Sequence, residues 1–301
     1  MTAPGSPRGS ASVRALLAGA IDYAGLFPPA GLDMVSAATN YAQYRTGTEA
    51  WALGSFVLPA TRLDELAVIA APMWASDGGA PWRLSALAGS DPEADKARIA
   101  RFEEAYGAYA RVASVETRAG SLEAIGTLAG LFAGTETFVE IPLDGDLASL
   151  IGTLKASGAR AKVRTGGVTP DAVPSTERMA RFLHACAGAG VPFKATAGLH
   201  HPVRDEYRMT YASDSVRGTM FGYLNVFLAA VLAREGVSVT RLQEVLGFHD
   251  RATLAFTDRE IAWHGVHVTG EQLAETRATF ARAFGSCSFR EPLDDLDTLF
   301  T

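Results

Sequence analysis

The chain has 301 residues, of which 48% are hydrophobic and 20% charged, and its formal net charge at pH 7 is −6. This composition is typical of folded globular proteins, and it excludes a chain that is mainly disordered. Because no run of lysine and arginine forms a basic stripe, nucleic acid is excluded as an expected partner. Two cysteines, Cys186 and Cys287, are too few for a disulfide framework and fit a reducing, cytoplasmic location.

The amino-terminal segment and the most apolar segment carry no pattern of export or membrane insertion. Residues 1–12 are small, polar and rich in proline and glycine, so we expect a disordered tail without the apolar region of a signal peptide. Residues 220–232 are the most apolar, but Gly222 and Asn225 interrupt them, and they fall short of the roughly 20 residues that cross a bilayer. We therefore expect a buried helix there and no membrane partner.

From residue 33 onwards, short β-branched or apolar runs alternate with longer segments of helical periodicity, and glycine, proline and aspartate separate them. This alternation predicts βα units. The predicted strands cover residues 20–23, 55–58, 83–87, 111–116, 138–143, 160–164, 192–196 and 285–289. Amphipathic helices are expected between them.

The connection between the seventh and eighth predicted strands is unusually long. Its length of about 90 residues exceeds what one crossover needs, so residues 203–284 are expected to form an elaborated crossover or lid. Within it we predict helices at residues 220–233, 240–247 and 271–283. Residues 254–267 fit either a helix or a small β excursion. Since no Gly-x-Gly-x-x-Gly motif follows a first strand, we predict an α/β fold with a single (β/α)8 TIM-type barrel over residues 13–301.

Polar side chains near the carboxyl ends of the predicted strands are the candidates for chemistry, because barrel enzymes place their catalytic residues there. They are Asp22, Tyr23, Glu116, Glu140, Lys162, Arg164, Lys194, His200 and His201. Lys162 and Lys194 stand on adjacent strands. Desolvation and a second nearby ammonium both favour a neutral amine, which can attack a carbonyl and form a Schiff base. The alternative is that each lysine pairs with a carboxylate.

Four short segments occur in a distinctive order and spacing. They are residues 20–30 (AIDYAGLFPPA), 162–166 (KVRTG), 194–199 (KATAGL) and 285–288 (GSCS). Together they resemble the signature segments of the deoxyribose-phosphate aldolase superfamily of class I aldolases. The resemblance implies that Lys162 is the Schiff-base nucleophile and that Lys194 favours its neutral form. It also implies that backbone amides of the last segment receive a substrate phosphate.

The chain departs from this family at three places. Glu116 stands where the family has an aspartate that relays protons, and its side chain is one methylene longer. Arg164 replaces a small residue, and its guanidinium either binds a substrate carboxylate in a bidentate way or pairs internally with Glu140 or Glu116. His200 and His201 replace a phosphate-binding loop. These departures favour an oxo acid over a phosphosugar as the substrate.

We therefore predict a class I aldolase, a carbon–carbon lyase, that acts on a small oxo compound, preferably an oxo acid, without a metal or an organic cofactor. The predicted catalytic residues are Lys162, Lys194, Glu116 and Asp22. The predicted substrate-binding residues are Arg164, Thr165, Glu140, Tyr23, Thr196, His200, His201, Gly285, Ser286 and Ser288. We also expect a homo-oligomer.

Two alternatives remain open. An isomerase, hydratase or hydrolase, with or without a metal, could use the same side chains as acids, bases or ligands. A catalytically inactive barrel could serve as a binding subunit. Adjacent His200 and His201 point to opposite sides of an extended segment, so we expect one of them to act as an acid or base and not as part of a metal chelate. Cys287 lies in no motif of a cysteine nucleophile, and we expect a small buried thiol.

Overall fold

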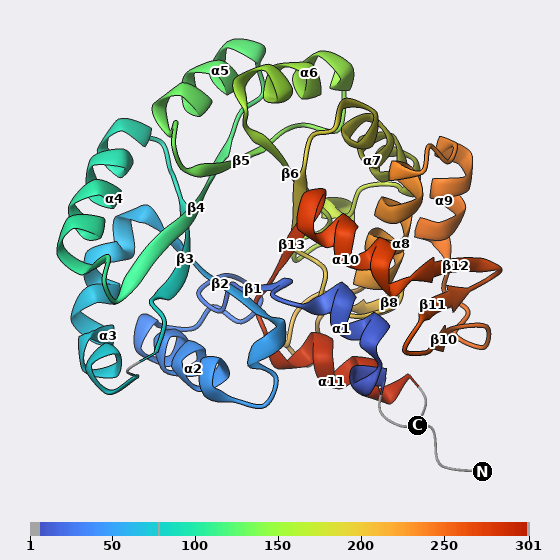
Figure 1. Cartoon of the computed structure of the whole chain (residues 1–301), viewed down its shortest axis with the longest axis horizontal. Coiled ribbons are helices and arrows are strands. Elements are labelled where there is room, and N and C mark those ends of the chain that lie inside the picture. Colours follow the sequence, from blue (N-terminus) through green and yellow to red (C-terminus); the bar gives the residue numbers. More distant parts are fainter. Residues whose placement is uncertain (1–6, 78, 300–301) are drawn as a thin grey trace.

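The computed structural model describes residues 7–77 and 79–299, and in it eight parallel strands close into a barrel that helices surround (Figure 1). The barrel strands are β1 (Ile21–Tyr23), β2 (Leu53–Pro59), β3 (Trp82–Leu87), β4 (Ala110–Arg118), β5 (Glu136–Glu140), β6 (Arg160–Arg164), β7 (Phe193–Thr196) and β13 (Ala281–Ser286). Neighbours in this order pair with each other, and β13 closes the barrel by pairing with both β7 and β1. The predicted (β/α)8 barrel is confirmed.

Helices that alternate with the strands form the outer layer of the barrel (Figure 1). They are α2 (Met34–Thr46), α3 (Leu63–Asp77), α4 (Pro92–Tyr106), α5 (Leu122–Leu131), α6 (Leu147–Ser157) and α7 (Thr176–Ala189). Several begin where a side-chain oxygen accepts a hydrogen bond from a free backbone N–H of the first turn. The capping residues of α2, α4, α5, α6 and α7 are Asp33, Asp91, Ser121, Asp146 and Ser175.

The long connection before the last strand holds a hairpin, three helices and a small sheet. Strands β8 (Asp205–Arg208) and β9 (Arg217–Met220) form the antiparallel hairpin. The rest consists of α8 (Tyr223–Arg234), α9 (Val239–Gly247), β10 (Ala255–Phe256), β11 (Glu260–Trp263), β12 (Val266–Thr269) and α10 (Gly270–Thr279). Residues 254–267 thus belong to a β excursion, in which alternate side chains of β11 and β12 are buried, as the period of a strand requires.

The apolar segment at residues 220–232 lies mostly in α8, whose side chains are buried almost throughout. This helix packs against α7, α9 and α10. Among residues 7–77 and 79–299, no helix combines the length and the hydropathy needed to cross a membrane. The predicted buried helix is confirmed.

The eighth strand begins earlier than the sequence pattern predicts. We expected it at residues 285–289 and a helix over 271–283, but α10 ends at Thr279 and β13 already starts at Ala281. Phe284 pairs with Ile21 of β1 and with Ala195 of β7. Alanine and arginine have little intrinsic preference for strands, so pairing on both sides of the strand determines its position.

The expected amino-terminal tail is wrong for residues 7–12, whereas residues 1–6 lie outside the described part of the chain. Pro7–Gly9 form a 3-10 turn, η1, and α1 (Ala11–Leu17) follows. Ser10 caps α1 by accepting a hydrogen bond from the N–H of Val13. Ser12 is fully buried and donates a hydrogen bond of 2.6 Å to the carbonyl of Thr257. Tertiary contacts with the long connection therefore order a segment whose composition suggests disorder.

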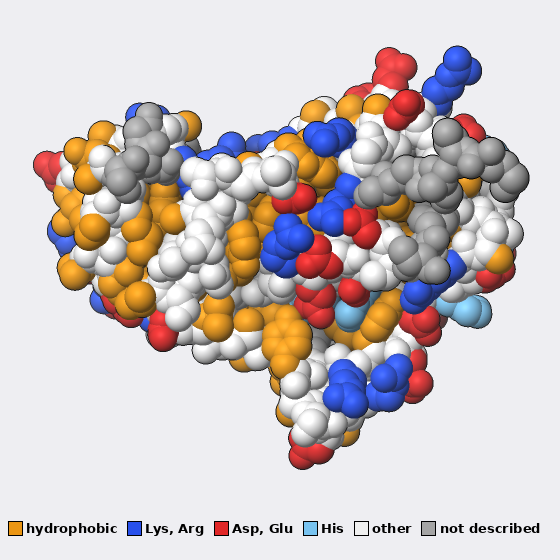
Figure 2. Space-filling model, turned by 90° about the horizontal axis from the view of Figure 1, so that it is seen from below, with side chains coloured by type: hydrophobic (Ala, Val, Ile, Leu, Met, Phe, Trp, Pro, Cys, Tyr) orange, Lys and Arg blue, Asp and Glu red, His pale blue; other side chains and the backbone are white. Residues whose placement is uncertain are grey.

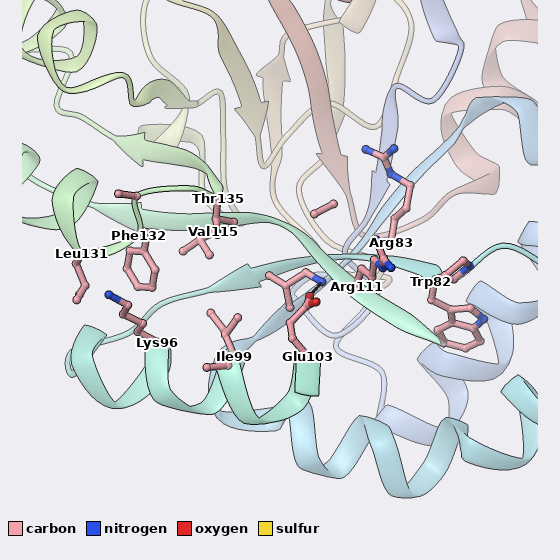
Figure 3. A pocket seen from close by; sticks show the side chains of 15 residues that line it. Trp82, Arg83, Lys96, Ile99, Glu103, Arg111, Val115, Leu131, Phe132 and Thr135 are labelled. Atoms are coloured by element: carbon pink, nitrogen blue, oxygen red, sulfur yellow. Dashed lines mark hydrogen bonds between the residues drawn. The ribbon is translucent and has the colours of Figure 1, made fainter. Parts of the chain in front are cut away.

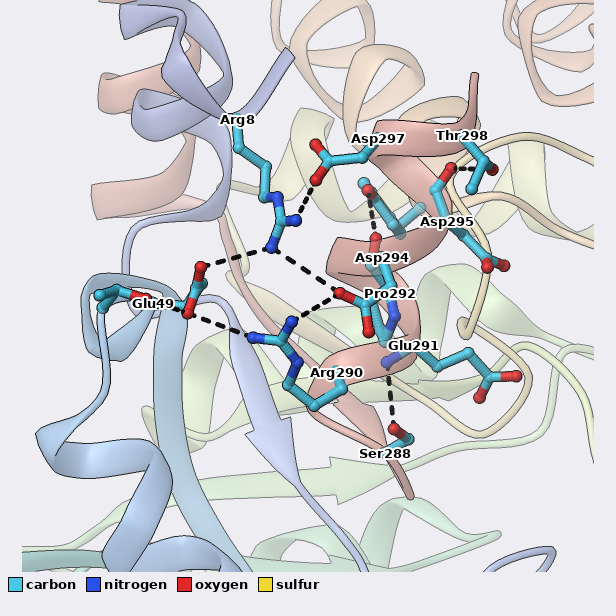
Figure 4. A network of polar contacts seen from close by, with 12 residues as sticks. Arg8, Glu49, Ser288, Arg290, Glu291, Pro292, Asp294, Asp295, Asp297 and Thr298 are labelled. Carbon is cyan, nitrogen blue, oxygen red and sulfur yellow. Dashed lines mark hydrogen bonds and ion pairs between the residues drawn. The ribbon is translucent and has the colours of Figure 1, made fainter. Parts of the chain in front are cut away.

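An ion-pair network joins η1 to the last helix, α11 (Arg290–Thr298) (Figure 4). Arg8 pairs with Asp297 and lies 3.4 Å from Glu49, while Arg290 lies 3.2 Å from Glu49 and 2.8 Å from Asp294. Single exposed pairs stabilise little, but shared partners restrict one another's side chains. The network therefore anchors α11 beside the barrel. Figure 2 shows a face on which basic and acidic side chains are interspersed in the same way.

The loops that follow β6 and β7 touch through two glycines. A Cβ on Gly198 would lie 2.9 Å from the Cα of Gly166, and Gly198 has a φ of +78°. Ala197 also has a positive φ, of 59°. Only glycine permits both this close approach and the left-handed backbone without strain. Gly166 in the segment 162–166 and Gly198 in the segment 194–199 thus allow the two loops to touch at the mouth of the barrel.

We predict that Gly198→Ala lowers the free energy of unfolding by about 1–3 kcal/mol, because the new Cβ meets backbone in a left-handed conformation. Gly152→Ala in α6 is the matched control, since a Cβ there has nothing within 4 Å. That control is expected to raise stability by up to about 1 kcal/mol. Urea unfolding curves of both variants measure the difference. Equal stability of the two variants would contradict the proposed loop contact.

Candidate active site

Five charged side chains from five barrel strands converge inside the mouth of the barrel. Asp22 comes from β1, Glu116 from β4, Glu140 from β5, Lys162 from β6 and Lys194 from β7. Glu140 pairs with Lys162 and Lys162 with Lys194 in the register of the strands. Paired residues of neighbouring strands point to the same face, and here that face is the barrel interior.

Glu116 bridges the two lysines. Its Oε1 lies 2.5 Å from the Nζ of Lys194, and its Oε2 lies 2.9 Å from the Nζ of Lys162. Each lysine has a second carboxylate, because Asp22 Oδ2 lies 2.5 Å from Lys194 and Glu140 Oε2 lies 3.4 Å from Lys162. The four predicted catalytic residues, together with Glu140, therefore form one cluster.

The carboxylate and the ammonium at the centre of this cluster keep each other charged. Burial alone would raise the pKa of Glu116, but the two lysines outweigh it and hold that pKa well below its usual range. Burial alone would lower the pKa of Lys194, but Asp22 and Glu116 outweigh it and raise that pKa above its usual value. The expectation that an apolar strand makes its lysine neutral is thus wrong for Lys194, because two carboxylates accompany it into the interior.

Two serines that the sequence analysis did not single out complete the bonding of Glu116. Ser85 donates a hydrogen bond of 2.7 Å to Glu116 Oε1, and Ser114 donates one of 2.8 Å to the oxygen of Ser85. Both serines are buried on β3 and β4. A buried carboxylate needs such donors for its remaining lone pairs. Serine is common in strands, so only their inward-facing positions could have indicated this role.

A cavity of about 440 Å³ opens over the cluster. Lys162, Glu116, Arg164, Thr196 and His200 line it. Its other lining residues come from strands β2, β3 and β13 and from the loops after β1, β6, β7 and β13. They are Ala24, Phe27, Pro28, Pro29, Val57, Leu87, Gly167, Val168, Thr169, Ala172, Ala197, Gly198, Gly285 and Cys287. Lys194 is not among them.

The two lysines therefore differ in access. The side chain of Lys162 is 7% exposed and that of Lys194 is 1% exposed. Arg164 stands two residues after Lys162, and its side chain is 52% exposed at the cavity while its Nε lies 3.5 Å from Glu140 Oε1. Of the two lysine amines, only that of Lys162 is placed to meet a molecule in the cavity.

Six predicted substrate-binding residues do not line the cavity. Glu140 belongs to the charge cluster, Ser286 and Ser288 are described below, and the other three are Tyr23, Thr165 and His201. Tyr23 points to the outer side of the barrel, where its ring packs on Phe56 and its hydroxyl accepts a hydrogen bond of 3.2 Å from Asn40, because side chains alternate along β1. The hydroxyl of Thr165 donates to the carbonyl of Ala197 and ties two loops together. Neither side chain lines the cavity.

The third is His201, which turns away from the cavity while His200 faces it. His201 Nδ1 lies 2.5 Å from Asp295 Oδ2, and its ring stacks on that of Tyr207 with 3.5 Å between centroids. The two adjacent histidines do point in different directions, as expected of an extended segment. Only His200 remains a candidate for contact with a substrate.

The residues of the segment 285–288 differ in their access to the cavity. Gly285 lines the cavity, but Ser286 is buried with its Oγ 3.2 Å from His200 Nδ1. Ser288 accepts a hydrogen bond of 3.1 Å from the N–H of Glu291 at the start of α11. The residue of this segment whose side chain reaches the cavity is Cys287.

A larger cavity, of about 780 Å³, lies outside the barrel between α4 and strands β3 and β4 (Figure 3). Trp82, Lys96, Ile99, Glu103 and Arg111 are among its lining residues. Its single lysine, Lys96, belongs to α4 and not to the barrel interior. Size alone therefore does not identify the site, and the charge cluster does.

Comparisons with known proteins add no relatives. No protein-family model matches the chain, and the search of curated proteins finds no match. Within residues 7–77 and 79–299, no group of three or more His, Cys, Asp and Glu side chains is arranged to hold a metal ion. The side chains at the barrel mouth are therefore what indicates a function.

We predict that Glu116→Gln lowers the free energy of unfolding at pH 7 by about 3–5 kcal/mol, because it removes a charge that compensates two buried ammoniums. The lowered pKa of Glu116 means that its ionised form stabilises the fold above the unfolded pKa of about 4.3, and that this contribution is lost as the pH falls below it. The difference between wild type and variant should thus be largest near pH 7 and shrink below about pH 4.

Urea unfolding at pH 7, 5 and 3.5 measures this difference. Glu104→Gln, on the exposed face of α4, is the control and should show little difference from wild type at any pH. A gap between wild type and Glu116→Gln that does not change with pH would show that the carboxylate charge does not stabilise the cluster.

Proposed function

We propose that the chain is a class I aldolase, a carbon–carbon lyase that forms a Schiff base with a small oxo acid on Lys162. One observation carries the proposal: Lys162 presents its amine to the cavity at the barrel mouth, while Lys194 holds a second ammonium directly behind it. A nucleophilic amine needs access to the substrate, whereas a neighbouring cation needs only proximity. The different exposure of the two lysines supports this division of roles.

The use of lysine in this chain supports the same interpretation. Of the 27 lysine and arginine residues, four are lysines: Lys96, Lys155, Lys162 and Lys194. The chain uses arginine for nearly all of its other cationic positions, yet two of its four lysines meet inside the barrel. Arginine cannot lose its proton in a protein and therefore cannot form a Schiff base. Lysine at these positions is thus better explained by amine chemistry than by ion pairing alone.

In the proposed reaction, neutral Lys162 attacks the carbonyl carbon, and loss of water from the adduct leaves an iminium. Glu116 Oε2, 2.9 Å from Nζ, is placed to relay the proton that Lys162 must lose to the oxygen of the adduct that leaves as water, and its low pKa means that it does not keep this proton. The iminium withdraws electrons from the bond between its α- and β-carbons, which breaks. The electron pair forms an enamine on Lys162, and the β-hydroxyl loses its proton as that fragment leaves as a carbonyl compound. Protonation of the enamine at the α-carbon and addition of water to the new iminium then release the second fragment and free the amine. Lys194 stays charged and keeps Glu116 in place for this exchange.

Arg164 supports an acid as the substrate. Its half-exposed guanidinium lies on the same face of β6 as Lys162, about 7 Å away by strand geometry. At that separation it can bind a carboxylate one or two carbons from the carbonyl under attack. A homo-oligomer, a cytoplasmic location and catalysis without metal or organic cofactor stay predictions of the sequence.

We predict that borohydride, in the presence of small aldehydes and 2-oxo acids such as acetaldehyde and pyruvate, traps a covalent adduct on Lys162. Peptide mapping is unambiguous because there are only four candidate lysines. Lys162→Met should abolish the adduct on Lys162. Lys155 is an exposed residue of α6, and Lys155→Met should leave that adduct unchanged. A label on Lys194 alone would reverse the two roles. No adduct across the panel would favour the isomerase, hydratase, hydrolase or inactive-barrel alternatives.

We predict that Arg164→Lys raises the concentration of oxo acid that gives half-maximal trapping by about 10–100-fold, because it loses a charge-assisted bidentate contact. The concentration for a neutral aldehyde should change little. Arg118→Lys is the matched control, since Arg118 lies 3.9 Å from the same Glu140 oxygen but is 84% exposed. Equal weakening for acids and aldehydes would mean that Arg164 only shapes the site through Glu140.

A further inference from the structure

A second group of titratable side chains meets on the wall of the same cavity. Cys287, directly after β13, lines the cavity and is 4% exposed. Its Sγ lies 3.8 Å from His200 Nδ1 and 3.4 Å from the hydroxyl oxygen of Tyr211. We expected Cys287 to be a small buried thiol, and it is buried. That expectation does not account for its two polar partners.

His200 connects this thiol to a carboxylate. His200 Nδ1 lies 3.4 Å from Glu291 Oε2, and Glu291 accepts a hydrogen bond of 2.9 Å from the hydroxyl of Tyr211. Glu291 stands in the first turn of α11, which the ion-pair network holds beside the barrel (Figure 4). The thiol and the anchored carboxylate therefore approach the same imidazole nitrogen, Nδ1.

The contacts favour a thiolate beside an imidazolium. Burial alone would lower the pKa of His200, but Cys287 and Glu291 outweigh it and raise that pKa to about 9. Burial alone would raise the pKa of Cys287, but hydrogen bonds and charge from His200, with a further bond from Tyr211, lower it below its usual value. Tyr23 of β1 is a further titratable group that interacts with Cys287.

We propose that Cys287 is a second nucleophile of this cavity and a site of covalent addition for α,β-unsaturated carbonyl compounds. Thiolates are polarisable nucleophiles that prefer soft carbon electrophiles. A reactive cysteine must also be accessible to the electrophile, and the cavity gives that access to Cys287. The other cysteine, Cys186, is fully buried in α7, so it offers no partner for a disulfide at this site. The choice of a carbonyl ligand rests on the proposed function, since Lys162 and Arg164 are placed to bind a carbonyl and a carboxylate in the same cavity.

The addition needs no oxidant or second reactant. The proton of Cys287 passes to His200, and the thiolate forms a C–S bond to the β-carbon of the ligand. The π electrons of the C=C bond move to the α-carbon, which then takes the proton back from the His200 imidazolium. The net reaction adds S–H across the C=C bond. Glu291 and Tyr211 hold His200 and the thiolate in place without themselves changing.

Alkylation by acrylamide, a neutral α,β-unsaturated amide, tests the proposal on the full chain. At pH 6.5, Cys287 should react on the order of tenfold faster in wild type than in His200→Gln, because without the imidazolium the thiol is mostly protonated. His201→Gln is the matched control, since His201 faces away from the cavity and should leave the rate unchanged. Mass spectrometry of peptides distinguishes the two cysteines, and labelling of Cys186 reports unfolding.

A second measurement uses wild type alone and does not depend on the folding of a variant. The rate of Cys287 alkylation against pH should have its midpoint below the value of about 8.5 for an ordinary thiol. A midpoint at or above that value, equal rates in wild type and His200→Gln, or no reaction in the folded chain would overturn the proposal. Borohydride adducts on Lys162 and alkylation of Cys287 are separate readouts on different peptides of the wild-type chain, so failure of the Schiff-base proposal and failure of this one give different results.

Discussion

The sharing of one buried carboxylate by two ammoniums is the interaction on which the site depends. Moving a single charge from water into a protein interior costs several kcal/mol, so Lys194 can lie on an inward-facing position of β7 only with Asp22 and Glu116 beside it. Glu116 in turn needs both lysines and the hydroxyl of Ser85. The parallel barrel makes this possible, because it brings the carboxyl ends of strands β1, β4, β6 and β7 to one mouth.

The same barrel makes two similar side chains different. Lys162 and Lys194 are direct partners in neighbouring strands, yet the loops after β1, β6 and β7 leave the first open to a cavity and enclose the second. The touching glycines, Gly166 and Gly198, hold two of these loops in place. The same residue type thus provides one amine that faces the cavity and one that is enclosed behind it. The same cavity is also lined by a thiol, that of Cys287, directly after β13.

The ends of the described chain contribute to the site from a distance. Arg8 before α1 and Arg290 in α11 share Glu49 as a partner, so the first and last elements are held together (Figure 4). Because α11 begins immediately after the last strand, this anchoring also places Glu291 against His200. The ion pairs that anchor α11 at the surface thus also help to place the carboxylate of Glu291 beside His200, which lines the cavity.

The alternation of strands and helices along the chain predicts the barrel and the long connection before its last strand. It also predicts the grouping of Asp22, Glu116, Lys162 and Lys194, because polar residues at the ends of alternating strands must meet when the sheet closes. Which side chains face the cavity depends instead on how the elements pack in three dimensions. In a strand as short as β1, periodicity does not distinguish an inward Asp22 from an outward Tyr23, and the partners of Cys287 come from segments 76 and 87 residues away in the chain. Such long-range contacts depend on how separate elements pack, and no local pattern records them.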